Sequence, residues 1–141
     1  MRIVRWDEFE GLVSALAFQI GPGKYKYIYG IPRGGSVVAV LLSHMLNKPV
    51  LDVVDPHNYI HGGFGRILVV DDISDSGGTL KDFAARFGGL VEFDTATVFT
   101  KPGTAYQPTF TAAATDEWIR FPWETGLPDT VSKVRPPGTP T

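Results

Sequence analysis

A run of four aliphatic residues that leads into two carboxylates and a glycine turn constrains this chain most. Ile67–Val70 is typical of a strand buried on both faces of a parallel sheet. Asp71 and Asp72, the acidic pair, follow at the expected carboxyl end of this strand, and the turn Ser76–Thr79 comes shortly afterwards. The i, i+3, i+4, i+7 spacing of one apolar helix face is then given by Leu80, Phe83, Ala84 and Phe87. We therefore expect a strand–turn–helix unit of an α/β fold, and ligands bind at such corners.

The turn after the acidic pair is suited to a phosphate group. Gly77 and Gly78 have no Cβ, so their backbone N–H groups can approach an anion closely. The helix that follows offers unpaired N–H groups, and Ser76 and Thr79 add hydroxyl donors. The acidic pair would repel phosphate but fits sugar hydroxyls or a hydrated magnesium ion. Together these groups indicate a ribose 5-phosphate site, and a plain βα turn with Asp or Ser as its N-cap is the alternative.

The same stretch resembles the phosphoribosyl-diphosphate-binding signature of type I phosphoribosyltransferases. That signature is an aliphatic run, two acids, two spacers and Asp-Ser/Thr-Gly-Gly-Thr, which residues 67–79 match. The resemblance implies a type I phosphoribosyltransferase-like α/β fold with a mostly parallel sheet, flanking helices and a small hood. It implies that the acidic pair, Asp71 and Asp72, binds the ribose and Mg2+. The 5-phosphate would be bound by Asp75, Ser76, Gly77, Gly78 and Thr79.

A second strand–glycine turn–helix unit precedes the first one. Lys24–Tyr29 predicts a core strand, and a helix ending near Asn47 is indicated by an apolar stripe of Val37, Val40, Leu41 and Met45. The guanidinium of Arg33 in the intervening turn is suited to a highly charged group such as pyrophosphate. The turn resembles the pyrophosphate loop of the family, which implies that pyrophosphate is bound by Pro32, Arg33, Gly34 and Gly35. Relatives commonly hold a cis peptide here, so we predict one near Pro32-Arg33.

Other segments complete the predicted sheet and its covering helices. Asp7 is expected to cap a first helix, with Glu10 at the capping-box position. The core-facing stripe of that helix is Phe9, Leu12, Val13 and Leu16. Further strands are expected at Pro49–Val54, Thr95–Thr100 and Thr109–Ala113. His44, near the stripe of the second helix, is interpreted as a packed or surface residue.

The connection at residues 55–65 is rich in turn formers and glycine, so it is a candidate lid. In the family, a flexible loop in this region closes over the reaction centre and excludes water. Here the connection is shorter than in many relatives. His57, Tyr59 and His61 are candidates to replace the usual loop contacts, and an ordinary loop with two exposed histidines is the alternative.

The carboxyl-terminal part of the chain resembles bacterial xanthine-guanine phosphoribosyltransferases. The shared pattern is Lys-Pro-Gly from residue 101, a short strand, and then Trp-Ile-x-x-Pro-Trp followed by an acid. It implies that Lys101 contacts the purine oxygen at position 6, that Trp118 stacks on the base and that Ile119 reads its edge through the main chain. Trp123 is expected to pack inside the hood, and Glu124 to lie near magnesium or pyrophosphate.

Length and composition limit the other possibilities. The chain has 141 residues, a formal net charge of −2 with interspersed charges, and no cysteine, which excludes disulfides and cysteine–zinc sites. No basic block indicates nucleic-acid binding, and no apolar run is long enough to indicate a signal core or a membrane span. We expect a cytoplasmic single domain over residues 1–127, with a hood mainly from 104–127 and a Pro-rich flexible tail at 128–141.

The resemblance implies a reaction in which ribose 5-phosphate passes from phosphoribosyl diphosphate to N9 of a 6-oxopurine (guanine, xanthine or hypoxanthine) and pyrophosphate leaves. Asp75 is the candidate general base at N7 of the purine. No nucleic-acid or membrane partner is expected, and family membership implies a homodimer or homotetramer. One alternative is a non-catalytic regulator that senses a nucleotide or phosphoribosyl diphosphate. Another is a metal-dependent phosphate hydrolase that uses the acidic pair.

Overall fold

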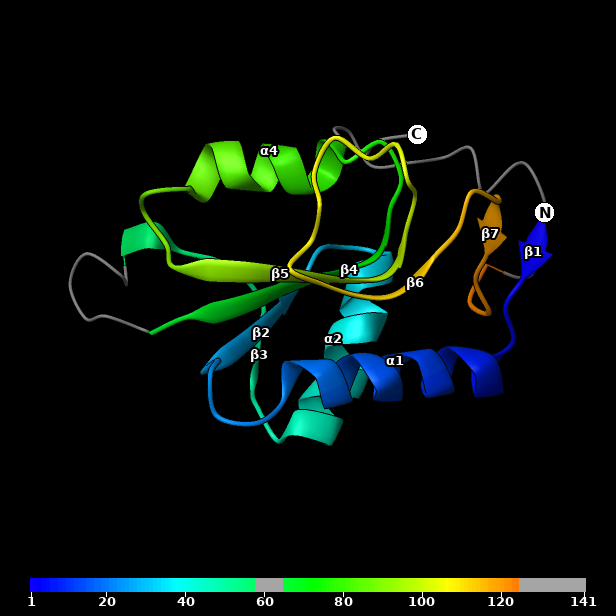
Figure 1. Cartoon of the computed structure of the whole chain (residues 1–141). Coiled ribbons are helices and arrows are strands. Elements are labelled where there is room, and N and C mark those ends of the chain that lie inside the picture. The colour runs from blue at the N-terminus through cyan, green and yellow to red at the C-terminus, as the bar shows by residue number, and fades with distance from the viewer. Residues whose placement is uncertain (58–64, 125–141) are drawn as a thin grey trace.

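The computed structural model of the chain describes residues 1–57 and 65–124. Its elements are β1 (Arg2–Ile3), α1 (Trp6–Ile20), β2 (Tyr27–Gly30), α2 (Gly34–Leu46), β3 (Val50–Leu51), β4 (Ile67–Ser74), α4 (Gly78–Phe87), β5 (Phe93–Thr100), β6 (Phe110–Ala114) and β7 (Ile119–Arg120). The larger sheet has the order β3-β2-β4-β5-β6 with all pairs parallel, and β1 pairs with β7 in a two-stranded sheet. Helices α1 and α2 lie on one face of the larger sheet and α4 on the other (Figure 1). The predicted α/β architecture, with a small hood that both terminal segments build, is confirmed.

Strand β4 forms the centre of the core because its aliphatic run is buried on both faces. Leu68 and Val70 pack with the side chains of α1 and α2, whereas Ile67 and Val69 pack with those of α4. All four side chains are inaccessible to solvent. Successive residues of a strand point to opposite faces, so one segment joins both layers. Burial of each such side chain stabilises the fold by about 1.5–3 kcal/mol.

The order of the strands reverses between β2 and β4. The chain leaves β2 through α2 and returns in β3, on one side of β2. It leaves β4 through α4 and returns in β5, on the opposite side. Because the two helices lie on opposite faces, the turns that follow β2 and β4 open beside each other, and the Ile31 N–H donates to the Val70 carbonyl across them at 2.9 Å. Such a switch point is where open α/β sheets form a ligand-binding crevice.

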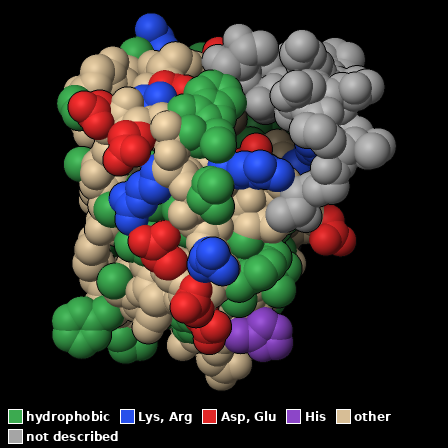
Figure 2. Space-filling view, turned by 90° about the vertical axis from the view of Figure 1, so that its right-hand side faces the viewer, with side chains coloured by type: hydrophobic (Ala, Val, Ile, Leu, Met, Phe, Trp, Pro, Cys, Tyr) green, Lys and Arg blue, Asp and Glu red, His purple; other side chains and the backbone are tan. Residues whose placement is uncertain are grey.

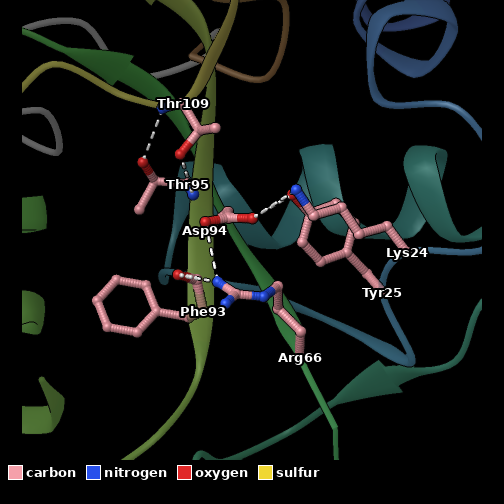
Figure 3. A network of polar contacts seen from close by, with 7 residues as sticks. All are labelled: Lys24, Tyr25, Arg66, Phe93, Asp94, Thr95 and Thr109. Carbon is pink, nitrogen blue, oxygen red and sulfur yellow. Dashed lines mark hydrogen bonds and ion pairs between the residues drawn. The ribbon is translucent and has the colours of Figure 1, made fainter. Parts of the chain in front are cut away.

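A polar network ties the strands together at the other end of the sheet (Figure 3). The Asp94 carboxylate accepts a hydrogen bond of 2.5 Å from the Tyr25 hydroxyl and forms ion pairs with Arg66 at 3.1 Å and Lys24 at 3.5 Å. Burial, and then the hydrogen bond to Asp94, raise the pKa of Tyr25 well above its usual value. The network joins the starts of β2, β4 and β5, far from the crevice.

The first helix confirms the predicted apolar stripe but not its predicted cap. Phe9, Val13 and Leu16 are completely buried. The N-cap, however, is Arg5, which makes no side-chain capping hydrogen bond, so the capping box expected from Asp7 is wrong. Asp7 lies in the first turn, where its carboxylate accepts the neighbouring N–H of Glu8. Negative charge at that place is favourable because it faces the positive end of the helix dipole.

The predicted stripe of α2 is half right, because Val37 and Leu41 pack against the core whereas Val40 and Met45 are exposed. Val40 and Met45 are 51% and 39% exposed, whereas the buried positions are Gly35, Val38, Ala39 and Leu42. The run from Val37 to Leu42 is almost continuously apolar, so it offers more than one possible stripe. The helix docks through Gly35, where an added Cβ would lie 2.5 Å from the Val70 carbonyl oxygen. Close approach of the two backbones therefore selects the face that a glycine allows.

The strands differ from the predicted segments mainly in length. The strand predicted at Pro49–Val54 is observed only as β3 (Val50–Leu51). This strand lies at the sheet edge and pairs only with β2. The strands β5 and β6 confirm the two later segments to within a few residues. Strand β4 continues to Ser74, so the acidic pair lies within the strand instead of after it. His44 is exposed on α2. No described helix combines the length and apolarity that crossing a membrane would require.

The close docking of α2 leads to a matched prediction on two helical glycines. Gly35→Ala should lower the free energy of unfolding by about 1–3 kcal/mol, because the new methyl group meets backbone that cannot move aside. Gly11→Ala in α1, where a Cβ meets nothing within 4 Å, should raise the free energy of unfolding by about 0.5–1 kcal/mol. Urea unfolding of both variants measures this. Equal effects of the two substitutions would contradict the docking geometry.

Candidate active site

The acidic pair lies at the switch point, with Asp71 buried and Asp72 half-buried. Asp71 is 8% exposed, and its Oδ1 accepts the Asp72 N–H at 2.9 Å. Asp72 is half-buried, and its Oδ1 accepts the N–H of Ile73 at 2.8 Å. Burial raises the pKa of both carboxyl groups, and the charge of Asp72 raises that of Asp71 further. In residues 1–57 and 65–124, neither carboxylate forms an ion pair with Lys or Arg.

The glycine turn after β2 lies directly against the acidic pair. A Cβ added at Gly34 would collide with the carboxylate of Asp72, so any other residue here would require the Asp72 side chain to shift. The peptide bond between Pro32 and Arg33 is cis, as predicted. Arg33 is exposed and precedes α2, and its carbonyl accepts the N–H of Ser36 at 3.1 Å. The predicted pyrophosphate loop, residues 32–35, therefore borders the predicted ribose site.

The turn after β4 has the geometry of an anion-binding helix start. Gly77 has a φ of +88° and is the N-cap of α4. Gly78 and Thr79 form the first turn of this ten-residue helix, whose N–H groups point toward the crevice end of the sheet. The Gly78 N–H donates to the Ser76 hydroxyl at 3.2 Å. Backbone donors and two hydroxyl groups thus gather at the positive end of the helix dipole.

A second segment, residues 101–106, packs on this turn, which the sequence did not predict. The hydroxyl groups of Ser74 and Thr104 are 2.8 Å apart, and the Ala105 N–H donates to the Ser76 carbonyl at 2.8 Å. A Cβ at Gly77 would lie 2.5 Å from the backbone nitrogen of Tyr106. Gly77 is therefore required both for its backbone conformation and for this close contact. From the sequence, Gly77 was assigned to close approach of an anion, and neither of these two requirements was indicated.

Three residues that are distant in sequence meet beside the phosphate turn. The Lys101 Nζ lies 3.4 Å from Asp75 Oδ1 and 6.0 Å from the centroid of the Trp118 ring. Trp118 is 56% exposed, so one large aromatic face is open. Lys101 comes directly after β5 and Trp118 directly before β7, which brings both to the end of the sheet where β4 releases Asp75. The sequence marked these three residues one by one, and the structure brings them together.

The two tryptophans of the hood, Trp118 and Trp123, differ in their surroundings. Trp123 stacks on Phe121 with a centroid separation of 4.8 Å and meets Phe9 edge-on at 5.0 Å, so it packs inside the hood as predicted. Ile119 is buried and starts β7. The Arg2 N–H donates to the Trp118 carbonyl. Trp123 is therefore a core residue, whereas Trp118 presents its ring to solvent.

Glu124 lies at the end of the described hood. Its Oε1 accepts the Phe121 N–H at 3.2 Å, and its carbonyl accepts a hydrogen bond from the Arg120 side chain at 2.9 Å. Its negative charge raises the pKa of Asp72, which places it on the side of the acidic pair. The described part of the chain nevertheless contains no cluster of three or more His, Cys, Asp or Glu side chains that could hold a metal ion.

Two predicted features lie wholly or partly outside the described residues. Of the candidate lid, Tyr59 and His61 fall in the range 58–64. His57 is described, and its N–H donates to Asp55 Oδ1 at 3.0 Å. The predicted tail, residues 128–141, and the last three residues of the predicted hood also lie outside.

The arrangement can bind two anionic groups, a cation and a planar group at once. One glycine turn lies on each side of the acidic pair, which carries negative charge suited to a cation or to hydroxyl groups. The open Trp118 face and the Lys101 ammonium lie beyond the second turn.

On the face of the molecule that carries β1 and β7, acidic and basic side chains alternate (Figure 2).

Comparisons with known proteins agree with this geometry. The model of the phosphoribosyl transferase domain matches residues 53–130. A xanthine-guanine phosphoribosyltransferase of Idiomarina loihiensis is 35% identical over 88% of this chain and 87% of its own length, and one of Chromohalobacter salexigens is 31% identical over 88% and 84%. The structure of a purine phosphoribosyltransferase from Pyrococcus horikoshii superposes with a TM-score of 0.71 and 28% identity, covering 89% of this chain and 95% of that one. The switch-point site and these matches together show that the chain belongs to the phosphoribosyltransferase family.

Proposed function

We propose that this phosphoribosyltransferase transfers ribose 5-phosphate from phosphoribosyl diphosphate to N9 of a 6-oxopurine and releases pyrophosphate. The observation that carries the proposal is the meeting of Asp75, Lys101 and Trp118 next to the two glycine turns. The relatives named xanthine-guanine phosphoribosyltransferase support the choice of a purine. They do not favour a non-catalytic regulator.

Each turn has a separate role in binding phosphoribosyl diphosphate. Pro32, Arg33, Gly34 and Gly35 bind the pyrophosphate, where the exposed guanidinium of Arg33 supplies charge-assisted hydrogen bonds. Asp75 and the turn 76–79 surround the 5-phosphate, which the N–H groups at the start of α4 bind. The carboxylates of Asp71 and Asp72 accept hydrogen bonds from the ribose hydroxyls between the two anionic groups.

The acidic pair fits a magnesium ion that arrives with the substrate. Asp71 and Asp72 have no cationic partner among the described residues, and their pKa values are raised, so both favour a cation nearby. Mg2+ commonly uses one or two carboxylates together with waters and substrate phosphates. A site with only two protein carboxylates agrees with this. Glu124, the third predicted ligand, does not form a metal-holding cluster with these two carboxylates in the described residues. Held by Asp71 and Asp72, such an ion would supply positive charge against the departing pyrophosphate.

The purine is held between the hood and the end of β5. Trp118 offers its exposed ring for stacking, Lys101 donates to the oxygen at position 6, and the main chain of Ile119 meets the base edge. As the bond from C1′ to the pyrophosphate oxygen breaks and the bond to N9 forms, Asp75 accepts the proton from N7. The ribose gains positive charge in this step, and the acidic pair stabilises that charge electrostatically.

A direct assay tests the proposed function. The full chain is incubated with Mg2+, phosphoribosyl diphosphate and guanine, xanthine, hypoxanthine or adenine in separate reactions, and nucleotide and pyrophosphate are quantified. We expect nucleoside 5′-monophosphate and an equal amount of pyrophosphate with at least one 6-oxopurine. Tight binding of phosphoribosyl diphosphate without any product would support the regulator. Release of phosphate without a base would support the hydrolase.

Asp75→Asn tests the general base. The substitution keeps the shape but removes the proton acceptor, so kcat should fall by about 10²–10⁴-fold. The KM for phosphoribosyl diphosphate should change much less, because the N–H donors of α4 remain. Asp82→Asn, the same change at an exposed position of α4, is the matched control and should leave kcat unaltered. Equal losses in kcat and in phosphoribosyl diphosphate binding would refute the assignment.

Asp71→Asn separates stability from function. Burial raises the folded-state pKa of Asp71, so its ionisation opposes folding once the pH exceeds the unfolded-state pKa. At pH 8 the neutral amide should therefore raise Tm by about 2–4 °C, the shift that 1 kcal/mol produces in a domain of this size. Near pH 4, where the carboxyl group is largely protonated, the gain should shrink, and turnover should fall at all pH values. A Tm gain that is independent of pH would contradict the electrostatic origin.

Several features stay predictions from the sequence. These are the limits of the single domain at residues 1–127, the tail at 128–141, the homodimer or homotetramer, and the cytoplasmic location.

A further inference from the structure

The purine-reading segment is attached to the amino-terminal strand through its main chain. Strand β1 pairs in parallel with β7, in a register that sets Arg2 opposite Ile119. The Arg2 N–H donates to the Trp118 carbonyl at 2.8 Å, and the Val4 N–H donates to the Arg120 carbonyl at 2.9 Å. The hydrogen bonds thus engage the residues on both sides of Ile119, whose own N–H and C=O are not part of this ladder.

This pairing matters because the side chain of Trp118 is largely exposed. Its side chain is 56% exposed, and its ring has the Lys101 ammonium 6.0 Å from the centroid. The hydrogen bond from Arg2 therefore holds the backbone from which the ring projects. The same pairing directs the N–H and C=O of Ile119 away from β1.

Arg2 is itself anchored to two other elements. Its guanidinium lies 5.2 Å from the centroid of the Phe99 ring and 2.7 Å from the carboxylate of Glu8. Phe99 belongs to β5, the strand that ends just before Lys101, and Glu8 belongs to the first turn of α1. Val4, which follows β1, is 1% exposed and packs in the main core. The terminal strand is thus fixed with respect to the strand that delivers Lys101.

We propose that β1 is a positioning element of the purine site and that Arg2 is its positioning residue. This inference rests on the proposed function. The backbone of Arg2 fixes the position and direction of the Trp118 backbone. The side chain of Arg2 contacts β5 and so fixes this position relative to Lys101. Neither glycine turn takes part in the β1–β7 pairing, so weakening this attachment should affect the purine and not phosphoribosyl diphosphate.

Proline substitutions at adjacent positions test the backbone contact. Arg2→Pro removes the N–H that donates to Trp118, whereas Ile3→Pro removes an N–H that the ladder does not use, from a residue that is 61% exposed. Arg2→Gln keeps the backbone donor but removes the charge, and Arg2→Lys keeps both. All variants and the wild type carry the same Gly-Ser extension before Met1, which is 72% exposed, so that residue 2 stays within a peptide chain after processing.

The measurements are the KM for the purine, the KM for phosphoribosyl diphosphate, kcat and Tm. Arg2→Pro should raise the purine KM about 5–10-fold, as expected from the loss of one hydrogen bond. The KM for phosphoribosyl diphosphate should not change. Arg2→Gln should give a smaller rise that Arg2→Lys largely reverses, and Ile3→Pro should resemble the wild type. Trp118→Ala gives the upper limit, since loss of base stacking should raise the purine KM by about 5–150-fold.

The outcomes separate this inference from the proposed function. If the wild type forms no nucleotide, the proposed function fails. If it does form nucleotide, equal effects of Arg2→Pro and Ile3→Pro, or parallel rises in both KM values, overturn the positioning role. If Arg2→Pro does not fold, the decision passes to Arg2→Gln and Arg2→Lys. An unchanged purine KM in Arg2→Gln, or a raised one that Arg2→Lys fails to lower, then overturns it.

Discussion

The site depends on the contact between a glycine turn and a pair of buried carboxylates. Gly34 and Gly35 allow the start of α2 to meet Asp72 and the Val70 carbonyl, at distances that any side chain would prevent. This contact sets the turn after β2 beside the turn after β4. Because the sheet reverses its order at this point, the two helix starts approach one crevice from opposite faces. A diphosphate and a monophosphate on one ribose need such a pair of anion sites at a fixed separation.

The same contact carries an electrostatic cost. Two neighbouring carboxylates lie at a buried place where the described residues offer no cation, so their charged forms are disfavoured. A protein built for stability alone would have neutral residues here. In the proposed function the cost would become useful when hydroxyl groups and a metal ion enter together, because positive charge would then relieve a repulsion that already exists.

The sequence predicted the local strand–turn–helix geometry well where adjacent residues form it. Strand β4, its acids and the turn 76–79 belong to one segment, and local spacing was sufficient for them. It failed where docking between distant backbones decides the outcome. Val40 and Met45 were wrongly assigned to the buried face of α2 because Gly35, and not the apolar run, selects that face. The helix cap was wrong because the chain enters α1 from β1, and the helix already begins at Trp6. The Thr104 contact with Ser74 had no local signal.

The two halves of the site therefore have different physical origins. An anion can be bound by one turn and one helix start, because glycine and unpaired N–H groups provide all the donors within a few residues. A planar base offers no charge of comparable strength, so its recognition requires groups aimed from several directions. In the proposed site these groups come from β5 and β7 and, through the backbone, from β1, which lies at the opposite end of the described chain from β7. Such long-range pairings form only when the whole domain is folded, because their closure entropy must first be offset by the core. We therefore expect purine recognition to depend on the completed fold, whereas phosphate binding depends mainly on the turn.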